Sequence, residues 1–506
     1  MKKILALLLV LCMTVGMLAC GKPADSTDGT KDNATDGTKG TTTPIRTDIN
    51  TIAEEDLALK TLADKSNAAY ITPEKFQGKK LQIAGLNSDT FTDLANMGKG
   101  NYNWMIRAAI DEWATLNKVE VTFDCAYAVN DVMAAINAGT KLDLAFGMGS
   151  AELGTYPAQG ISAPFTQAQY DELVKICGPQ FVDMAKRKGE SHGVLYPWGG
   201  THFYYWNDTV LQQYGAKTPA DYFKEDNWTW ATMEKLWEDC TKDFNGNGKI
   251  DENDTYGIGG NTTHLGRWSK LTEDPVTGKL TGTKGTNPIY KELQEMIYKG
   301  RYQTLSHALS GTKTCKTTTM PRSLTHTGDC EWYNFEHQYS TLENGDVIKA
   351  TMTPTYNNGQ TVVNYTTRFV SMLSSCDEPE AAFSLLCYVL KCGIRYVSDF
   401  SVGLYKNEYD GIQGKSEYSA GWKKIFEEVC EERRATFAQI EDWDQELYEK
   451  AIKKMFAEDT IAHAIRSYPG EVEKVKIGDL PPASSIPLLV AEQDAWIAKY
   501  NELYAG

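Results

Sequence analysis

The sequence has no long hydrophobic run beyond its first twenty positions, and it has few positive charges for its size. Its first apolar run extends only from Ile4 to Ala19, which is shorter than the roughly 20 residues of a membrane-spanning helix. Lysine and arginine number 51 against 67 aspartate and glutamate, giving a net charge of −16. This composition excludes a polytopic membrane protein. It also argues against a nucleic-acid binder, which needs a basic face to neutralise phosphates.

Motifs for common catalytic and metal chemistry are also lacking. No Cys-x-x-Cys pair and no His-Glu-x-x-His motif occurs, although the chain has 11 cysteines and 7 histidines. Residues 189–193 match the Gly-x-Ser-x-Gly pattern around Ser191, but a nucleophile elbow needs a strand before the serine and a helix after it. We expect the reverse order, with a helix at 181–188 and an extended segment at 194–198. The sequence therefore predicts no catalytic residue, and Ser191 is expected in a turn that leads into a strand.

The composition is globular and rich in aromatic residues. Of the 506 residues, 42% are hydrophobic and 23% are charged, and there are 12 tryptophans and 27 tyrosines. This length is typical of two or three domains with large cores. Once Cys12 and Cys20 are set aside, the remaining cysteines are odd in number and irregularly spaced. We expect most of them, including Cys387 and Cys392 in an apolar helical stretch, to be buried free thiols.

The N-terminal segment has the features of an export signal. Lys2 and Lys3 precede the apolar run, which ends at 17–21 in Met-Leu-Ala-Cys-Gly. This ending resembles the bacterial lipoprotein box, in which the cysteine, here Cys20, is lipidated and becomes the new N-terminus. Residues 21–44 are small and polar, and such a segment cannot bury enough apolar surface to become ordered. We therefore predict a signal peptide at 1–19, followed by a lipidated cysteine and a flexible linker at 20–46.

Strands and helices alternate in the following part of the chain. The pattern predicts strands at 81–86, 119–123 and 142–146, and helices at 103–117, 131–138, 168–176 and 181–188. Such alternation is typical of an α/β layer structure with a largely parallel sheet. Further along, Thr229 is a candidate N-cap for a helix at 231–241, and Pro379 begins a helix that is expected to end at Leu390.

Residues 243–254 match a twelve-residue calcium-binding loop. Oxygen donors stand at the required positions, and Gly248 allows the sharp turn at position 6. Position 12 is an aspartate, where an EF-hand has the longer glutamate. The alternative is a solvated turn rich in Asp and Asn. We predict a structural Ca²⁺ site with the ligands Asp243, Asn245, Asn247, Lys249, Asp251 and Asp254.

A series of short segments follows the lipoprotein box and linker in a fixed order. They are 142–146 (Leu-Asp-Leu-Ala-Phe), 194–197 (Val-Leu-Tyr-Pro), 205–208 (Tyr-Trp-Asn-Asp), 218–219 (Thr-Pro), 228–230 (Trp-Thr-Trp), 256–258 (Tyr-Gly-Ile) and 378–382 (Glu-Pro-Glu-Ala-Ala). In this order the chain resembles the extracellular solute-binding proteins of ABC transporters, family 1, the maltose-binding-like carbohydrate class. The resemblance covers most of the mature chain.

The resemblance implies an α/β, two-lobed periplasmic-binding-protein-like fold with hinged crossover strands. Lobe 1 would comprise 47–200 and 363–405, and lobe 2 would comprise 201–362 and 406–506. Such a protein is a receptor rather than an enzyme. It captures a carbohydrate, here expected to be an oligosaccharide, and delivers it to the permease subunits of an ABC importer. We expect a monomer that is held by its lipid on the extracellular face of a bacterial cell membrane.

The resemblance also implies ligand-binding residues where strands end. These candidates are Asn87, Ser88, Met148, Ser150, Trp198, Thr201, His202, Asn261, His264, Trp268 and Trp332. Sugars offer apolar faces to aromatic rings and hydroxyls to polar side chains, which supports a mixture of this kind. We expect ligand contact from Trp198 and Trp332, whereas Trp113, Trp237 and Trp496 lie on helical faces that should belong to the core.

Three alternatives remain open. The same fold could bind a peptide, a polyamine or another polar solute, although the aromatic density near Trp198 and Trp206 favours a sugar. A surface glycan hydrolase would use Ser191 or a carboxylate pair and would release products. A lipoprotein that only holds glycans would have no transporter partner.

Overall fold

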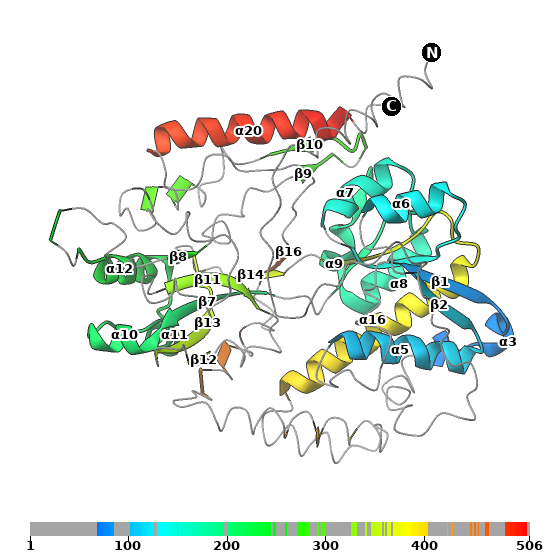
Figure 1. Cartoon of the computed structure of the whole chain (residues 1–506), viewed down its shortest axis with the longest axis horizontal. Coiled ribbons are helices and arrows are strands. Elements are labelled where there is room, and N and C mark those ends of the chain that lie inside the picture. The colour runs from blue at the N-terminus through cyan, green and yellow to red at the C-terminus, as the bar shows by residue number, and fades with distance from the viewer. Residues whose placement is uncertain are drawn as a thin grey trace, which may run out of the picture. The chain divides into compact units, whose positions relative to one another are not determined.

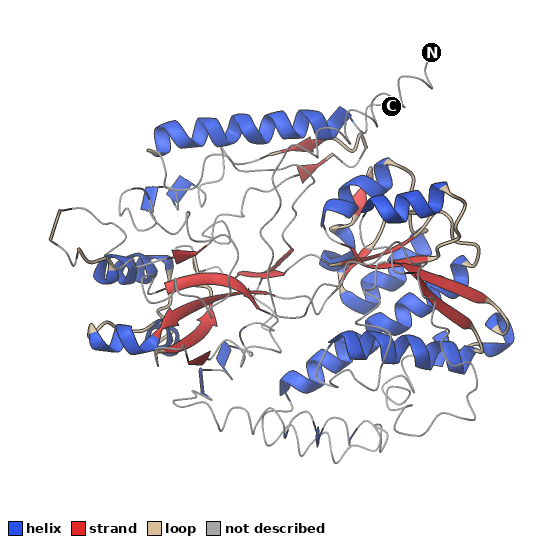
Figure 2. Cartoon of the chain, in the orientation of Figure 1, coloured by secondary structure: helices blue, strands red, loops and turns tan. Residues whose placement is uncertain are grey.

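The computed structural model describes residues 68–84, 102–124, 129–148, 150–196, 201–243, 246–248, 259–260, 272–274, 276–282, 291–292, 295–296, 298, 325–330, 340–341, 346–356, 359, 362–365, 368–402, 423, 427–428, 431, 446–447, 450–451, 454, 461–464 and 481–502. Figures 1 and 2 show their helices and strands. The predicted helix at 103–117 and the strand at 119–123 are found as α5 (Tyr102–Asn117) and β2 (Glu120–Asp124). Two short elements, η3 (Ala68–Tyr70) and α3 (Pro73–Phe76), precede them.

The first sheet has five strands in the order β2-β1-β3-β15-β6. Its other strands are β1 (Lys80–Ala84), β3 (Leu144–Met148), β6 (Val194–Leu195) and β15 (Phe369–Met372). β1 pairs in parallel with β2 and β3, whereas β15 is antiparallel to β3 and β6. The predicted α/β layer with a largely parallel sheet is confirmed, with one antiparallel strand inserted from far along the chain.

Both faces of the first sheet are buried, and successive residues point to opposite faces as strand geometry requires. Ile83 and Val370 belong to the hydrophobic cluster that includes α5 and α16 (Pro379–Val402), whereas their neighbours Ala84 and Phe369 belong to the cluster on the other face. Figure 1 shows α5 and α16 along one side of the sheet and α6 (Val129–Asn137) and α7 (Ser150–Ala158) on the other. Because both faces are covered, a ligand can reach these strands only at their ends.

The structure corrects the helix expected at 181–188. After α8 (Gln167–Cys177), the helix α9 (Pro179–Asp183) ends early, and β4 (Lys186–Arg187) pairs antiparallel with β5 (Glu190–Ser191). The two residues between these strands, Lys188 and Gly189, have φ angles of 50° and 79°. A two-residue hairpin turn uses this left-handed conformation. The glycine that suggested a nucleophile elbow in the sequence therefore closes a hairpin.

The second sheet is mainly antiparallel and is organised around β7 (Thr201–Asn207). Its strand order is β12-β13-β7-β11-β8, and β14 pairs with both β7 and β16. The bounds are β8 (Gly259–Gly260), β11 (Thr325–Cys330), β12 (Ser340–Thr341), β13 (Val347–Met352), β14 (Val362–Tyr365) and β16 (Ile461–Ala464). The antiparallel partners of β7 are β11, β13 and β14.

Aromatic side chains fill the space around β7. Tyr204, Tyr205 and Trp206 are at most 1% exposed, and the nearby helices are α10 (Asp208–Gln213), α11 (Pro219–Lys224) and α12 (Trp230–Cys240). Trp237 on α12 donates a hydrogen bond to Tyr204 Oη at 2.6 Å. Trp113, Trp237 and Trp496 are all buried, as predicted for core residues. Trp206 is buried as well, so it cannot contribute to a sugar site and does not support the argument from the aromatic residues near it.

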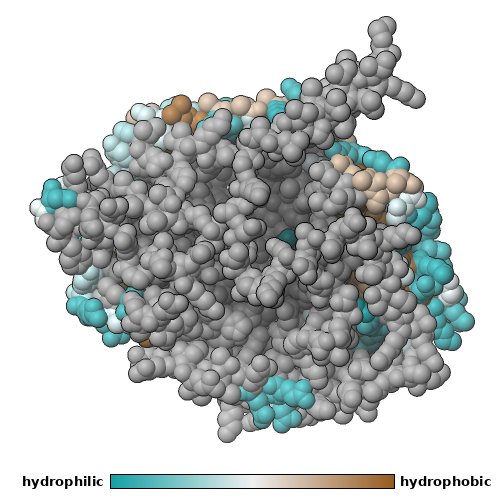
Figure 3. All heavy atoms as spheres, in the orientation of Figure 1, coloured by the Kyte–Doolittle hydropathy of each residue, from teal (hydrophilic) through white to brown (hydrophobic). Residues whose placement is uncertain are grey.

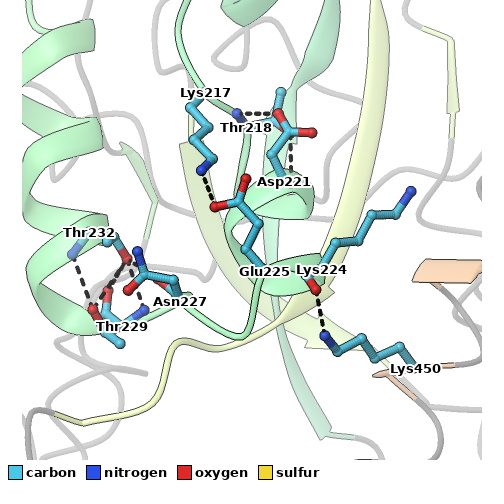
Figure 4. A network of polar contacts seen from close by, with 9 residues as sticks. All are labelled: Lys217, Thr218, Asp221, Lys224, Glu225, Asn227, Thr229, Thr232 and Lys450. Atoms are coloured by element: carbon cyan, nitrogen blue, oxygen red, sulfur yellow. Dashed lines mark hydrogen bonds and ion pairs between the residues drawn. The ribbon is translucent and has the colours of Figure 1, made fainter.

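A polar network fixes the turn between α11 and α12 (Figure 4). Thr218 and Thr229 each form a capping box at the start of their helix, so the predicted N-cap at Thr229 is confirmed. Lys450 donates to the carbonyl oxygen of Lys224 at 2.8 Å and pairs with Asp226 at 2.7 Å. Asp226 has a φ of 56°, a left-handed conformation that aspartate adopts more readily than most residues other than glycine. The lysine therefore ties a later segment of the chain to this turn.

The last described helix, α20 (Pro482–Glu502), binds a small hairpin of β9 (Thr272–Glu273) and β10 (Leu280–Thr281). The amide of Asn501 accepts from Leu280 N at 2.7 Å and donates to Leu280 O at 3.2 Å, as a neighbouring strand would. Figure 3 shows hydrophobic surface along α20, where Leu488 is 47% exposed. No helix in the described part of the chain combines the length and apolar character of a membrane span.

The described cysteines agree with the sequence prediction. Cys240, Cys387 and Cys392 are buried thiols, and Cys177 and Cys376 are half-buried thiols; none of these five described cysteines is in a disulfide. Burial raises the pKa of the Cys240 thiol to about 12. Thiols of this kind are small hydrophobic residues rather than nucleophiles.

Candidate ligand-binding edge

The carboxyl ends of β1, β3 and β6 meet at one edge of the first sheet. β15 begins at this edge, because Phe369 pairs with both Met148 and Leu195. The chain also reverses its direction of travel across the sheet here, since β1 lies between β2 and β3. In open α/β sheets ligands bind outside the carboxyl ends of the strands, at such a switch point. We call this the carboxyl edge, marked by Ala84, Met148, Leu195 and Phe369.

Three polar contacts fix the carboxyl edge. The buried Tyr196 accepts a hydrogen bond through Oη from Gly147 N at 2.9 Å, and its own N–H donates to Arg368 O at 2.8 Å. The guanidinium of Arg368 donates through Nη1 to Gly147 O at 3.3 Å. Gly147 has a φ of 69°, which a side chain at that position would disfavour. The ends of β3, β6 and β15 are therefore held together by residues 147, 196 and 368.

Two predicted ligand-binding residues lie at this edge, and two others begin the strand that follows it in the chain. Met148 is the last residue of β3, and Ser150 is the first residue of α7. Thr201 and His202 begin β7. Tyr196 and Thr201 are five residues apart, so their Cα atoms lie within about 18 Å of each other. Trp198 falls in the link between them, outside the described residues.

After the link 197–200 the chain enters the second sheet at Thr201, the first residue of β7. Thr201 pairs with Cys330, the last residue of β11, and with Tyr365, the last residue of β14. Tyr365 in turn precedes Arg368 by only three residues. Two short links, 197–200 and 366–367, therefore connect the carboxyl edge to this end of the second sheet.

The remaining candidates lie outside the described residues, so their contacts stay predictions. They are Asn87, Ser88, Asn261, His264, Trp268 and Trp332. Trp332 follows the end of β11 by two residues, and Asn261 directly follows β8, which runs parallel to β11. Asn87 and Ser88 follow β1 at the carboxyl edge. The sequence reasoning missed Arg368 and Tyr196, because only the pairing of β15 with β3 and β6 brings them to Gly147.

Ser191 does not form a nucleophile elbow. It ends β5 and is 3% exposed, and its hydroxyl donates to Val182 O at 3.2 Å and Gly193 O at 3.1 Å. It lies in a strand rather than in the predicted turn. The structure therefore gives no support to a hydrolase that uses this serine.

The described part of the calcium loop is folded around Asp243. One carboxylate oxygen accepts from Gly246 N and the other from Gly248 N, both at 2.7 Å. Both glycines have positive φ angles, 68° and 79°. This geometry fits position 1 of an oxygen cage, although a metal-free turn uses the same bonds. Asn247 is also described, whereas Asn245, Lys249, Asp251 and Asp254 lie outside the described residues. Among described side chains, no three His, Cys, Asp or Glu residues form a metal-binding group.

Comparison with known proteins identifies the fold. No protein-family model matches the chain, and no curated protein matches its sequence. The solved structure of the sugar-binding protein MalE from the phytopathogen Xanthomonas citri matches with a TM-score of 0.52 and 13% identity, covering 84% of this chain and 99% of that chain. This chain has the fold of the two-lobed solute-binding proteins. The predicted fold class is confirmed, whereas the predicted lobe boundaries stay predictions.

Other solved structures match at lower scores. The cyclic alpha-maltosyl-1,6-maltose binding protein from Arthrobacter globiformis has a TM-score of 0.47 and 10% identity, covering 84% of this chain and 96% of that chain. An extracellular solute-binding protein of family 1 from Alicyclobacillus acidocaldarius has a TM-score of 0.45 and 10% identity, covering 85% of this chain and 99% of that chain.

Proposed function

We propose that this protein captures an oligosaccharide between its two lobes and delivers it to the permease of an ABC importer. The observation that carries the proposal is the carboxyl edge, where Met148, Ser150 and Arg368 lie at a switch point of a solute-binding fold. Two short links join this edge to the second sheet, which suits closure of two lobes around a ligand. The protein performs no chemistry on the captured sugar.

A thermal-shift screen against mono- and oligosaccharides tests this function, because a ligand that binds only the native state raises the melting temperature. We expect at least one sugar to stabilise the protein and to be recovered unchanged. Trp198→Ala and Trp332→Ala should each weaken that binding while the protein stays folded. Release of smaller sugars would instead identify a hydrolase, and stabilisation by peptides or polyamines alone would contradict a sugar ligand.

We also propose that residues 243–254 hold a structural calcium ion. The ligands would be Asp243, Asn245, Asn247, Lys249, Asp251 and Asp254, and the ion would fix this loop rather than take part in capture. The two hydrogen bonds of Asp243 support the proposal because they place its carboxylate inside the turn. A chelator should lower the melting temperature, and Asp251→Ala should remove that response. An unchanged melt with no bound metal would contradict the site.

We further propose that a lipid on Cys20 anchors the protein to the membrane. A lipid on this residue would hold the protein at the extracellular face of the cell membrane, and residues 21–46 would let a monomeric receptor reach the permease. Cys20→Ala should move the protein from the membrane fraction to the medium or periplasm. Retention of the variant in the membrane would contradict lipid anchoring at this cysteine.

A further inference from the structure

Arg368 is an exposed cation at the carboxyl edge. It directly precedes β15, and its carbonyl oxygen accepts from Tyr196 N at 2.8 Å. Phe369, the next residue, is buried and paired on both sides. The backbone that carries the guanidinium is therefore fixed by strand pairing, while the side chain remains open to solvent.

The guanidinium has no acidic partner in the described part of the chain. Its one hydrogen bond goes to Gly147 O at 3.3 Å. Some other described cations do have acidic partners, since Arg107 pairs with Asp111 at 3.1 Å and Lys141 pairs with Asp377 at 2.9 Å. The guanidinium is therefore available to an anionic group of a ligand at the carboxyl edge.

Arginine suits one ligand chemistry in particular. A guanidinium has five N–H donors in a planar fork, and this fork matches a carboxylate through two parallel hydrogen bonds. Only one donor is used by Gly147 O, so a carboxylate can bind through the others. The contact with Gly147 also limits the conformations of the side chain, which reduces the entropy lost when a ligand binds.

Resting on the proposed sugar-binding function, we propose that Arg368 binds the carboxylate of an acidic sugar. The ligand is then an oligosaccharide that contains a uronic acid, and Arg368 distinguishes it from a neutral oligosaccharide of the same length. Met148, the last residue of β3, and Ser150, the first residue of α7, follow Gly147 closely in the chain and are the neighbouring candidates for ligand contact.

Calorimetric titration of the purified protein tests this inference. The probes are oligomers of galacturonate, glucuronate, mannuronate and guluronate, each with its neutral counterpart built from galactose, glucose, mannose or gulose. We expect an acidic oligomer to bind more tightly than its neutral counterpart. Arg368→Gln should weaken acidic binding about ten- to a hundredfold, as expected for a charge-assisted contact. Arg368→Lys should recover part of the loss.

Lys80→Gln is the matched control. Lys80 is an exposed cation at the amino end of β1, on the opposite edge of the same sheet, so its loss should leave affinity unchanged. Binding of neutral oligomers alone, unaffected by Arg368→Gln, would overturn the inference and leave the proposed function standing. Equal losses for acidic and neutral oligomers would also overturn it. Failure of every sugar to bind would overturn both.

Discussion

The two sheets of this protein differ in how they use their side chains. The first sheet buries mostly aliphatic residues on both faces, and its distinctive polar contacts lie at the strand ends, where Gly147, Tyr196 and Arg368 meet. The second sheet buries aromatic rings around β7, where Tyr204 and Trp206 are almost inaccessible. Because these rings belong to the core, a high aromatic content in a sequence does not by itself indicate a sugar-binding site. The position of a side chain relative to a strand end is more informative.

We expect the largest loss of stability from a substitution in the aromatic core around the second sheet. Trp237→Ala removes a fully buried ring and its hydrogen bond to Tyr204, which should cost about 3–5 kcal/mol of unfolding free energy. Trp237→Phe keeps most of the volume and should cost less. Urea unfolding followed by circular dichroism measures both. If Trp237→Ala unfolded at the same urea concentration as the wild type, the described role of this ring in the core would be wrong.

A smaller effect is expected at the carboxyl edge of the first sheet. Tyr196→Phe removes the oxygen that accepts from Gly147 N, which should cost about 1–2 kcal/mol and loosen the residues beside Met148. Ligand affinity should therefore fall together with stability. Tyr170→Phe is the control, because Tyr170 donates to Asp183 on the surface and its loss should be nearly neutral. If the two variants had the same stability and ligand affinity, the hydrogen bond between Tyr196 and Gly147 would not be what fixes the carboxyl edge.

The free energy of unfolding should depend on pH through the buried His192, which lies between β5 and β6. His192 is buried, and burial lowers its pKa, although its Nδ1 bonds with Ser162. The unfolded chain then takes up a proton at a higher pH than the folded protein does. Stability should fall as the pH decreases below about 6.5, by at most about 1.4 kcal/mol per pH unit. His192→Gln should flatten this slope, and an unchanged slope would show that another group is responsible.

The smallest effect concerns the buried thiols, which occur near both sheets. Cys240 lies on α12, and Cys387 and Cys392 lie on α16. Burial raises the pKa values of Cys240 and Cys387, so few thiolates exist at neutral pH. Alkylation followed by peptide mapping should label these cysteines only after unfolding. Rapid labelling in the native protein would contradict their described burial.

Much of the fold followed from local pattern, and the errors have physical causes. The strand β3 and the helix α5 were predicted within about two residues, because hydrophobic period alone specifies such elements. The helix beginning at Pro379 was expected to end at Leu390, yet α16 continues to Val402. Gly393 lowers helix propensity, but packing against α5 and α8 outweighs a cost of about 1 kcal/mol.

The candidate site was less predictable because it depends on distant pairing. Met148 and Ser150 could be proposed from the end of one strand. Arg368 could not, since nothing near it in the sequence distinguishes it, and its place is set when Phe369 pairs with Met148 and Leu195. Sequence pattern likewise gave no sign that Trp206 would be covered on its strand.

Hydrogen–deuterium exchange with and without the sugar found by the screen shows whether the ligand binds at the carboxyl edge of the first sheet. If the sugar binds at the carboxyl edge, exchange should become slower on binding at the end of β3, at the start of α7 and around Arg368. Exchange should change little at the amino end of β1, around Lys80, or in the turn between α11 and α12. Protection confined to those two control regions, with the carboxyl edge unchanged, would show that the sugar binds elsewhere.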